Sequence, residues 1–327
     1  MANSVGWGII GLGNIARKFA KDLSLVHDAA LMGVASRSLV KAKAFKEEFK
    51  VPYAFDNYEA LLDCEEVEVV YIAVPHTEHF EWSIKAMEKG KHVLCEKPAG
   101  INQAQVKEMV EAARKNKVFF MEALWSRFIP SIQEIKKSID AGEAGEIVYL
   151  HADFAFFALD RNPDSRVLNP ELGGGSLLDI GIYPVFLAYL ILGKPDRIEA
   201  HAKFLESGTE VQTAITFYYP GAHALLFSSL GTHSPMAATI AGTDGTFIIH
   251  PRWHEAEGFS LLSDEKKEEF EFPKVGKGYT YEIEEVHRCL SEDRLESPLW
   301  SHQHSLDLIS LLDRIREITG IRFPFEG

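Results

Sequence analysis

Residues 5–16 read VGWGIIGLGNIA, and this stretch decides the fold. Residues 5–10 are short and apolar, which is typical of a buried strand. Gly11-x-Gly13-x-x-Ala16 then fits the dinucleotide fingerprint, because its first glycine allows a tight turn and its second lets backbone approach a pyrophosphate. A helix that begins at such a turn attracts phosphate at its N-terminus. We therefore predict a cofactor site formed by Gly11, Gly13, Asn14, Ile15 and Ala16.

Apolar runs alternate with amphipathic stretches over the first third of the chain. The strands are expected at residues 5–10, 31–35, 67–74, 92–94 and 118–121, and the helices at 17–25, 41–49, 79–89 and 103–116. Strands that alternate with helices indicate a doubly wound parallel sheet. The sequence therefore predicts an α/β Rossmann domain over residues 1–122.

The rhythm changes after a helix expected at residues 131–141. Strand-like runs then follow one another with few helices between them, at residues 146–157, 198–204, 211–219, 223–230, 236–241, 246–250 and 259–262. This pattern predicts an α+β domain over residues 123–327 with a large, mostly antiparallel sheet. Two helices, 279–291 and 301–319, end the chain, and the C-terminal helix is able to pack back on the first domain. The charged residues 263–269 are predicted to form a solvated turn.

Composition excludes several classes of protein. The 327 residues carry a net charge of −14, which argues against a nucleic-acid partner. Three separated cysteines indicate a reducing compartment and no disulfide framework. The first residues lack the basic segment of a signal peptide, and we find no apolar run as long as a membrane span. We expect a cytoplasmic protein that binds no membrane.

The residues after the second strand favour NADP over NAD. An acidic residue there would bind the ribose 2′-hydroxyl of NAD. This chain instead has Ser36 and Arg37, with Lys41 one helical turn on, and a hydroxyl and a guanidinium suit a 2′-phosphate. The alternative is that Arg37 is an ordinary surface arginine.

Two further strand ends carry polar residues where such sheets bind ligands. Val74-Pro75-His76 ends one strand, and His79 follows; these four are predicted cofactor contacts, with loop packing as the alternative for the histidines. No third ligand accompanies the histidines, so we expect no metal. Glu96-Lys97-Pro98 ends the next strand. Lys97 can exchange a proton beside a nicotinamide, and Glu96 can hold the ammonium or bind ribose.

A second candidate cluster lies in residues 173–184, where a glycine-rich loop leads into a helix. Asp179 and Tyr183 are four residues apart and would share one helix face. Tyr183 can exchange a proton with a substrate hydroxyl, and Asp179 can orient it. The alternative is a helix-start aspartate with a core tyrosine.

Three motifs together resemble the Gfo/Idh/MocA oxidoreductases, named for glucose–fructose oxidoreductase and inositol dehydrogenase. They are the turn at residues 11–16, Cys95-Glu96-Lys97-Pro98, and the run from Gly173 to Tyr183. Residues 121–128 look like the branch of dimeric dihydrodiol dehydrogenase and NADP-dependent D-xylose 1-dehydrogenase. The resemblance covers residues 5 to about 324, nearly the whole chain.

The resemblance implies a Rossmann domain followed by an α+β domain with an open-faced sheet that forms a homodimer interface. It implies that Lys97 and Tyr183 converge at the catalytic centre with Asp179 nearby. We also predict that aromatic and basic residues bind the substrate, with packing as the alternative: Trp125, Arg127, Phe154, Phe156 and Arg166.

These observations predict an NADP-dependent dehydrogenase that moves a hydride between nicotinamide and a secondary alcohol, on a sugar, polyol or diol. Either Lys97 or Tyr183 accepts the hydroxyl proton. Two alternatives are a glycosidase that uses NAD for transient oxidation, and a non-catalytic NADP(H) sensor. The substrate itself does not follow from the fold.

Overall fold

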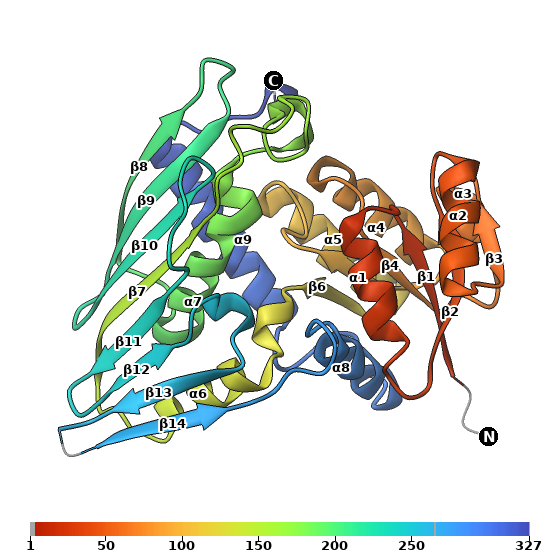
Figure 1. Ribbon diagram of the computed structural model, residues 1–327. Coiled ribbons are helices and arrows are strands. Elements are labelled where there is room, and N and C mark those ends of the chain that lie inside the picture. Colours follow the sequence, from red (N-terminus) through yellow and green to blue (C-terminus); the bar gives the residue numbers. More distant parts are fainter. Residues whose placement is uncertain (1–3, 265, 327) are drawn as a thin grey trace. The chain divides into compact units, whose positions relative to one another are not determined.

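A computed structural model describes residues 4–264 and 266–326, and these form two compact units (Figure 1). Unit 1 comprises the chain up to Phe128 together with Lys274–Leu306. Unit 2 comprises Ile129–Pro273 and the chain from Asp307 onward.

Unit 1 is built on a six-stranded parallel sheet with the strand order β3-β2-β1-β4-β5-β6. This is the order of the dinucleotide-binding Rossmann fold, so the predicted fold of the first domain is confirmed. The strand order reverses between β1 and β4, which makes their carboxyl ends the expected place for a ligand. The strands are β1 Val5–Ile10, β2 Ala29–Ala35, β3 Tyr53–Phe55, β4 Val69–Ile72, β5 His92–Glu96 and β6 Phe120–Ala123.

The helices of unit 1 begin where the sequence supplies caps. Ser38 and Asn102 each accept a hydrogen bond from a first-turn backbone N–H, at the starts of α2 and α5. The helices are α1 Asn14–Leu23, α2 Leu39–Phe49, α3 Tyr58–Leu62, α4 His79–Glu88, α5 Gln103–Asn116 and α8 Thr280–Ser291. Short 3₁₀ turns follow β4 at His76–Glu78 and β6 at Trp125–Arg127.

Two short elements of unit 1 were not expected from the sequence. β3 has only three residues and α3 only five, too few to show a hydrophobic period. β3 exists because it pairs in parallel with Gly33–Ala35 of β2, and α3 begins at Asn57, whose side chain accepts from the N–H of Ala60. Both depend on partners distant in sequence or on a local cap.

The division into units differs from the predicted boundary between residues 122 and 123. Unit 1 takes back residues 274–306 because α8 packs on α1. The carboxylate of Asp22, in α1, accepts hydrogen bonds of 2.8–2.9 Å from the N–H groups of Lys277 and Tyr279 just before α8. Helix α9, His302–Thr319, begins in unit 1 and continues in unit 2.

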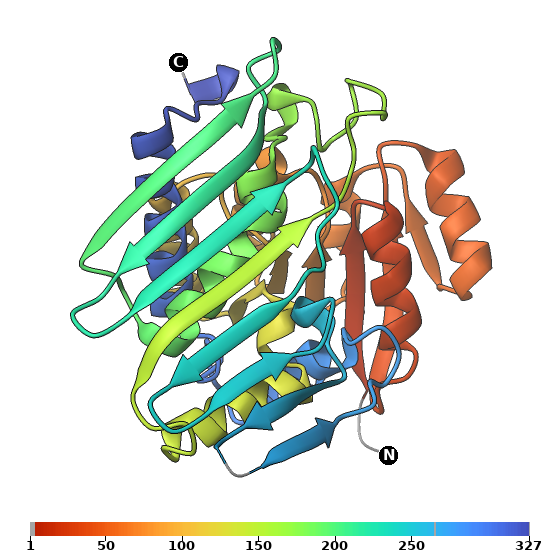
Figure 2. The ribbon, with the colours of Figure 1, turned by 60° about the vertical axis from the view of Figure 1, so that its left-hand side comes forward.

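Unit 2 is built on an eight-stranded sheet with the order β14-β13-β12-β11-β7-β10-β9-β8 (Figure 2). Among the described strands of this sheet, only the β7–β10 pair is parallel, so the predicted mostly antiparallel sheet is confirmed. The strands are β7 Ile147–Ala155, β8 Arg197–Phe204, β9 Glu210–Tyr218, β10 His223–Ser229, β11 Ala238–Gly242, β12 Thr246–Ile249, β13 Gly258–Leu262 and β14 Lys267–Glu271.

Strand β14 corrects part of the predicted solvated turn over residues 263–269. Residues 267–269 belong to β14, whereas Ser263 and Lys266 do flank a turn, in which the N–H of Ser263 donates to the carbonyl of Lys266 at 2.9 Å. Residue 265 lies outside the described residues.

The five residues of β14 alternate between exposed and half-buried, and they pair with β13. Phe270 stacks on Phe259 with ring centroids 4.8 Å apart, which anchors the strand. The charges misled the prediction because an edge strand of a sheet commonly carries charged residues that protect it from further pairing.

Helices cover one face of this sheet. In Figure 2, α6 (Pro130–Asp140) and α7 (Ile182–Leu192) lie behind it. By length and composition alone, the helical stretch Pro170–Leu192 is long and apolar enough to cross a membrane, contrary to the sequence expectation, but 83% of its most apolar part is buried inside the protein. That burial is what a core helix of this length would show.

Candidate active site

The glycine-rich turn between β1 and α1 leaves room for a ligand. Gly11 has φ +90°, and a Cβ there would lie 2.6 Å from the backbone of Ala73, so only glycine fits. Gly13 is different, because a Cβ there would meet no protein atom within 4 Å. No side chain caps the N-terminus of α1, where Gly13 and Asn14 are exposed, while Ala16 is buried. The turn thus offers backbone N–H groups and open space.

These features fit a dinucleotide. A pyrophosphate needs uncapped N–H donors at a helix N-terminus and a neighbouring residue without a side chain. Gly13 and the first turn of α1 supply both, and Ile15, the second residue of the helix, is half-buried.

The end of β2 holds the residues predicted to bind a 2′-phosphate. The Arg37 guanidinium is 70% exposed, and its Nη1 lies 3.2 Å from Oε1 of Glu78. Ser36 is buried, and its hydroxyl accepts from the N–H of Ser38. Lys41 is exposed in the first turn of α2. The acidic residue that would bind the ribose 2′-hydroxyl of NAD is absent from the end of β2. Glu78 nevertheless brings a carboxylate to Arg37 from the turn after β4.

The two predicted histidines after β4 differ in environment. His79 is fully buried, with Nδ1 2.8 Å from the carbonyl of Pro98 and Nε2 3.0 Å from the carbonyl of Val74. It joins the loops after β4 and β5, which supports the packing alternative over direct cofactor contact. His76 is also buried, with its ring centroid 5.6 Å from that of His79, beside Pro75. Among the described residues, no three histidine, cysteine or acidic side chains form a metal-binding group.

Glu96 and Lys97 lie at the end of β5. The Glu96 carboxylate is buried and accepts hydrogen bonds from the hydroxyl of Tyr71 and, at 3.3 Å, from the N–H of Lys97. Burial and the charge of Glu96 raise the pKa of Tyr71, so this phenol stays a hydrogen-bond donor. Lys97 is half-buried, and its peptide bond to Pro98 is cis. Glu96 thus braces the backbone that carries Lys97.

Glu122, at the end of β6, is a site residue to which we assigned no role from sequence. Its Oε1 accepts from the N–H of Ala99 at 2.9 Å, and its Oε2 from the indole of Trp300 at 3.1 Å. Burial raises the pKa of Glu122, and the positive charge of Lys97 is among the influences that lower it. Glu122 therefore holds the loop after Lys97 and places a carboxyl group near its ammonium.

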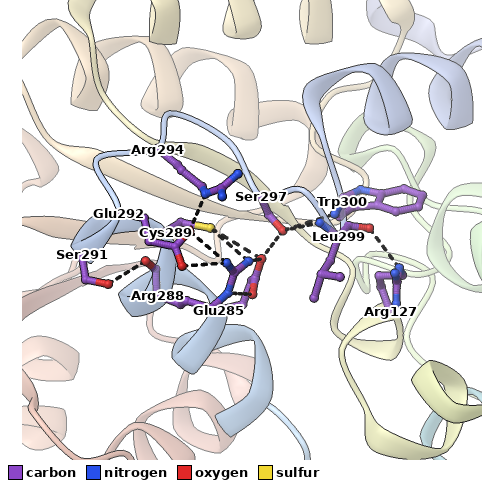
Figure 3. A network of polar contacts seen from close by, with 10 residues as sticks. All are labelled: Arg127, Glu285, Arg288, Cys289, Ser291, Glu292, Arg294, Ser297, Leu299 and Trp300. Carbon is purple, nitrogen blue, oxygen red and sulfur yellow. Dashed lines mark hydrogen bonds and ion pairs between the residues drawn. The ribbon is translucent and has the colours of Figure 1, made fainter. Parts of the chain in front are cut away.

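Trp125 and Arg127 follow β6 in a 3₁₀ turn. Trp125 is buried and stacks on Tyr279 with ring centroids 5.0 Å apart. Arg127 is buried, and its Nε donates to the carbonyl of Leu299 at 3.0 Å (Figure 3). The Arg127 side chain therefore supports residues 297–300, and substrate contact by either residue stays a prediction.

The cluster around residue 179 in unit 2 departs from the predicted helix. Leu177–Gly181 forms a π-helical turn that continues into α7. Asp179 and Tyr183 would share one helix face at α-helical spacing, and a π turn does not keep that spacing. Asp179 is buried and accepts a 2.9 Å hydrogen bond from the Arg166 guanidinium, so the structure brings these two predicted residues together as an ion pair.

Tyr183 lies in an aromatic cluster of unit 2. Its ring centroid is 5.4 Å from those of both Phe154 and His254, and these two stack at 4.1 Å. Phe156, just after β7, is 6.5 Å from Phe154 and lies under the guanidinium of Arg161. The cluster thus combines apolar ring faces with a phenol and an imidazole, a set that suits a ring with hydroxyl groups.

Comparison with known proteins identifies the family. A family model described as "Oxidoreductase family, NAD-binding Rossmann fold" matches residues 5–124, and the "GFO/IDH/MocA C-terminal domain" model matches residues 132–248. Mouse trans-1,2-dihydrobenzene-1,2-diol dehydrogenase is 35% identical over 331 residues, which cover 97% of this chain and 98% of the mouse protein. This chain belongs to the Gfo/Idh/MocA family of oxidoreductases. The predicted resemblance is confirmed.

Other relatives within this Gfo/Idh/MocA family extend the likeness. The human trans-1,2-dihydrobenzene-1,2-diol dehydrogenase is 32% identical over 97% of this chain and 98% of its own length. A 3-ketoreductase from Actinomadura kijaniata, solved with NADP and TDP-benzene, has a TM-score of 0.87 at 25% identity and covers 97% of this chain and 98% of its own. The aldose-aldose oxidoreductase from Caulobacter crescentus has a TM-score of 0.89 at 24% identity with the same coverage, and it shows the shared fold.

Sequence reasoning about this Gfo/Idh/MocA chain missed Glu122, Glu78 and His254. Glu122 had one available signal, because it ends the strand after the one that carries Lys97, and neighbouring parallel strands end at one edge. Glu78 and His254 had none. Their partners Arg37 and Phe154 are 41 and 100 residues away in sequence.

Proposed function

We propose that this protein is an NADP-dependent dehydrogenase that oxidises a secondary alcohol of a diol or sugar, or reduces the matching carbonyl. The observation that carries the proposal is Lys97, at the end of a strand beside the switch point of a dinucleotide-binding sheet, with Glu122 near it. Relatives named as dihydrodiol dehydrogenases and a 3-ketoreductase solved with NADP support it.

The cofactor, when bound, supplies a nicotinamide that accepts or returns the hydride. Lys97 or Tyr183 takes the proton of the substrate hydroxyl during oxidation and gives it back during reduction. Asp179, paired with Arg166, orients the substrate through its buried carboxylate. Glu96 and Glu122 hold the backbone on either side of Lys97, so that positioning supplies part of the catalysis.

The proposal includes a preference of this protein for NADP over NAD. Arg37, Ser36 and Lys41 lie where a 2′-phosphate is bound in this fold. Glu78 opposes that preference, because it neutralises Arg37 and must give way before a phosphate binds the same guanidinium. We propose that the phosphate, with its higher charge, replaces Glu78 as the partner of Arg37.

The substrate proposal rests on the aromatic cluster of unit 2. Phe154 and His254 present ring faces, which pack equally well on a sugar ring and on a dihydrobenzene diol. Trp125, Phe156 and Arg127 are the further proposed contacts. We therefore propose a cyclic substrate with neighbouring hydroxyl groups.

A homodimer is proposed through the uncovered face of the sheet. Leu225, His151, Thr239 and Ile248 are cross-strand neighbours in one row across β10, β7, β11 and β12. Leu225 and Ile248 are exposed large apolar residues, and a second copy would cover them. The measured molar mass in solution tests this part of the proposal.

A substrate panel tests the activity itself. We expect NADPH to form from NADP⁺ with at least one member of a set of aldoses, inositols and cyclic diols, and Lys97→Ala to lower the rate by orders of magnitude. NADPH formation by the variant at the rate of the natural protein would overturn the role of Lys97. Release of free sugar from a glycoside without NADPH accumulation would instead indicate the glycosidase alternative, and tight NADP binding without turnover would indicate the sensor.

A further inference from the structure

Glu210, the first residue of β9, is a buried carboxylate that accepts hydrogen bonds from the segment that carries Asp179 and from its own strand. Its Oε2 accepts from the N–H of Leu177 at 2.9 Å, and its Oε1 accepts from the hydroxyl of Ser176 at 2.6 Å. The hydroxyl of Thr213, also on β9, donates to the same Oε1 at 2.7 Å. Glu210 is 2% exposed, so these donors replace its hydration.

Burying the Glu210 carboxylate costs free energy, which indicates that its hydrogen bonds have a role beyond filling space. Burial raises the pKa of Glu210, and hydrogen bonds from Ser176, Thr213 and Leu177 act in the opposite direction. A buried carboxyl in a sheet is destabilising unless it is fully hydrogen-bonded, and an apolar side chain would have filled the same volume more simply. Ser176 and Leu177 donate from the start of the π turn, and Thr213 donates from β9, so Glu210 joins the turn to the sheet.

The other end of the π turn rests on the same surface. A Cβ on Gly181 would lie 2.8 Å from the hydroxyl oxygen of Ser228, so the backbone there packs directly on β10. Ser228 is the cross-strand partner of Thr213, and its hydroxyl lies 2.9 Å from that of Ser176. Ser176, Thr213, Ser228 and Glu210 therefore form one polar floor under residues 176–181.

We propose that Glu210 is a positioning residue for the reaction: it locks the π turn onto β9 and β10 and so fixes the direction in which Asp179 and Tyr183 point. The inference rests on the proposed function, since it assumes that these two residues act on the substrate. π turns inside helices occur frequently at functional sites. Here the turn changes the helical spacing between Asp179 and Tyr183. The carboxylate of Glu210 accepts from the N–H of Leu177, the first residue of the turn.

Three variants test the proposal. Glu210→Ala removes every acceptor, and we expect a loss of turnover on the order of 100-fold, because a displacement of about 1 Å has that effect. Glu210→Gln keeps one acceptor for the N–H of Leu177, while the hydroxyls of Ser176 and Thr213 can rotate to accept from its amide, so it should retain most turnover. Thr213→Val removes one donor with little change of shape and should give an intermediate loss, even where Glu210→Ala folds poorly.

Two readouts separate positioning from general stability. Amide hydrogen exchange of a peptide covering residues 176–183 should accelerate in Glu210→Ala and Thr213→Val but not in Glu210→Gln. In the same two variants the primary deuterium isotope effect on turnover should rise, because hydride transfer becomes slower relative to product release. The affinity for NADP should stay unchanged. The matched control is Phe247→Leu, a fully buried change in β12, three strands from β10. At an equal loss of Tm it should leave both readouts unchanged.

The outcomes are distinguishable. Unchanged exchange at residues 176–183 in Glu210→Ala would overturn the proposal, as would faster exchange with natural turnover. If Phe247→Leu changes the amide exchange and the isotope effect as much as Glu210→Ala does, Glu210 contributes only to stability. If Lys97→Ala and Tyr183→Phe both turn over like the natural protein while Glu210→Ala still accelerates exchange, the proposed function fails and the locking of the π turn stands.

Discussion

The guanidinium of Arg37 lies 3.2 Å from the carboxylate of Glu78, so the residue predicted to bind a 2′-phosphate already has an anionic partner. Arg37 follows β2, and Glu78 ends the turn after β4. The Arg37 side chain is 70% exposed and that of Glu78 23% exposed, and ion pairs at a protein surface contribute about 1 kcal/mol or less to stability. A bound phosphate can therefore displace Glu78 at modest cost.

This pair makes a prediction about cofactor choice. Glu78→Gln should strengthen NADP binding by about twofold to fivefold, since it removes the competing anion, and should change NAD binding little. Arg37→Ala should weaken NADP by roughly tenfold to a hundredfold, the effect of one hydrogen bond to a charged group, and NAD far less. Titration of each cofactor against protein fluorescence measures both. An equal loss for NAD and NADP in Arg37→Ala would refute the phosphate assignment.

The two glycines of the turn form a matched pair of variants. Gly13→Ala should fold with nearly natural stability, because φ at this position is −87° and its Cβ meets no protein atom, yet it should weaken cofactor binding by filling the pyrophosphate position. Gly11→Ala should lower Tm strongly, because its φ is +90° and its Cβ would overlap the backbone of Ala73. Thermal melts with and without NADP separate the two effects. Cofactor affinity that survives in Gly13→Ala would contradict the assigned pyrophosphate position.

Lys97 is expected to act in the chemical step. Lys97→Ala should lower turnover by about 100- to 10,000-fold, the usual contribution of a general acid–base group, with cofactor affinity nearly unchanged. Stopped-flow measurement of hydride transfer, together with a cofactor titration, checks both halves. Lys107→Ala is the control, because Lys107 is an exposed lysine on α5 of the same unit. A comparable loss in that variant would show that the effect is not specific to Lys97.

Glu282 makes a prediction about stability and pH. It is fully buried in the first turn of α8, and neither carboxylate oxygen has a hydrogen-bond partner among the described residues. Burial, together with the charges of Glu96 and Asp22, raises its pKa well above the usual value, and Tyr71 is a further neighbour. The folded state therefore favours the protonated acid. Its stabilising effect is complete below the unfolded pKa and is lost as pH rises towards the folded pKa.

Glu282→Gln removes this dependence. The free energy of unfolding of the variant, relative to the natural protein, should therefore rise with pH by up to about 1.4 kcal/mol per pH unit until the folded pKa is passed. Urea unfolding between about pH 5 and pH 9 measures it. Glu284→Gln is the control, because Glu284 is exposed on the same helix. A difference that stays constant over this pH range would show that Glu282 is ionised in the folded protein, as it is in the unfolded chain.

Local sequence carried enough information for the fold of both units and for the backbone of the site. Gly11 identifies the turn because the backbone geometry there excludes other residues, and Gly13 because a ligand needs the space that its missing side chain leaves. The alternation of apolar runs identifies the parallel sheet. The exceptions are instructive. β3 and β14 are too short or too charged to show a period, and each forms because a neighbouring strand supplies its hydrogen bonds.

Side-chain partners were decided by the tertiary structure. The sequence by itself determined that Lys97 follows a strand and that Asp179 follows a glycine-rich loop. It did not determine that Glu122 lies near Lys97 or that Arg166 pairs with Asp179. It also gave Asp179 and Tyr183 an α-helical spacing that the π turn replaces. The physical reason is that electrostatic partners and buried hydrogen bonds depend on distances in space, and these join residues far apart along the chain.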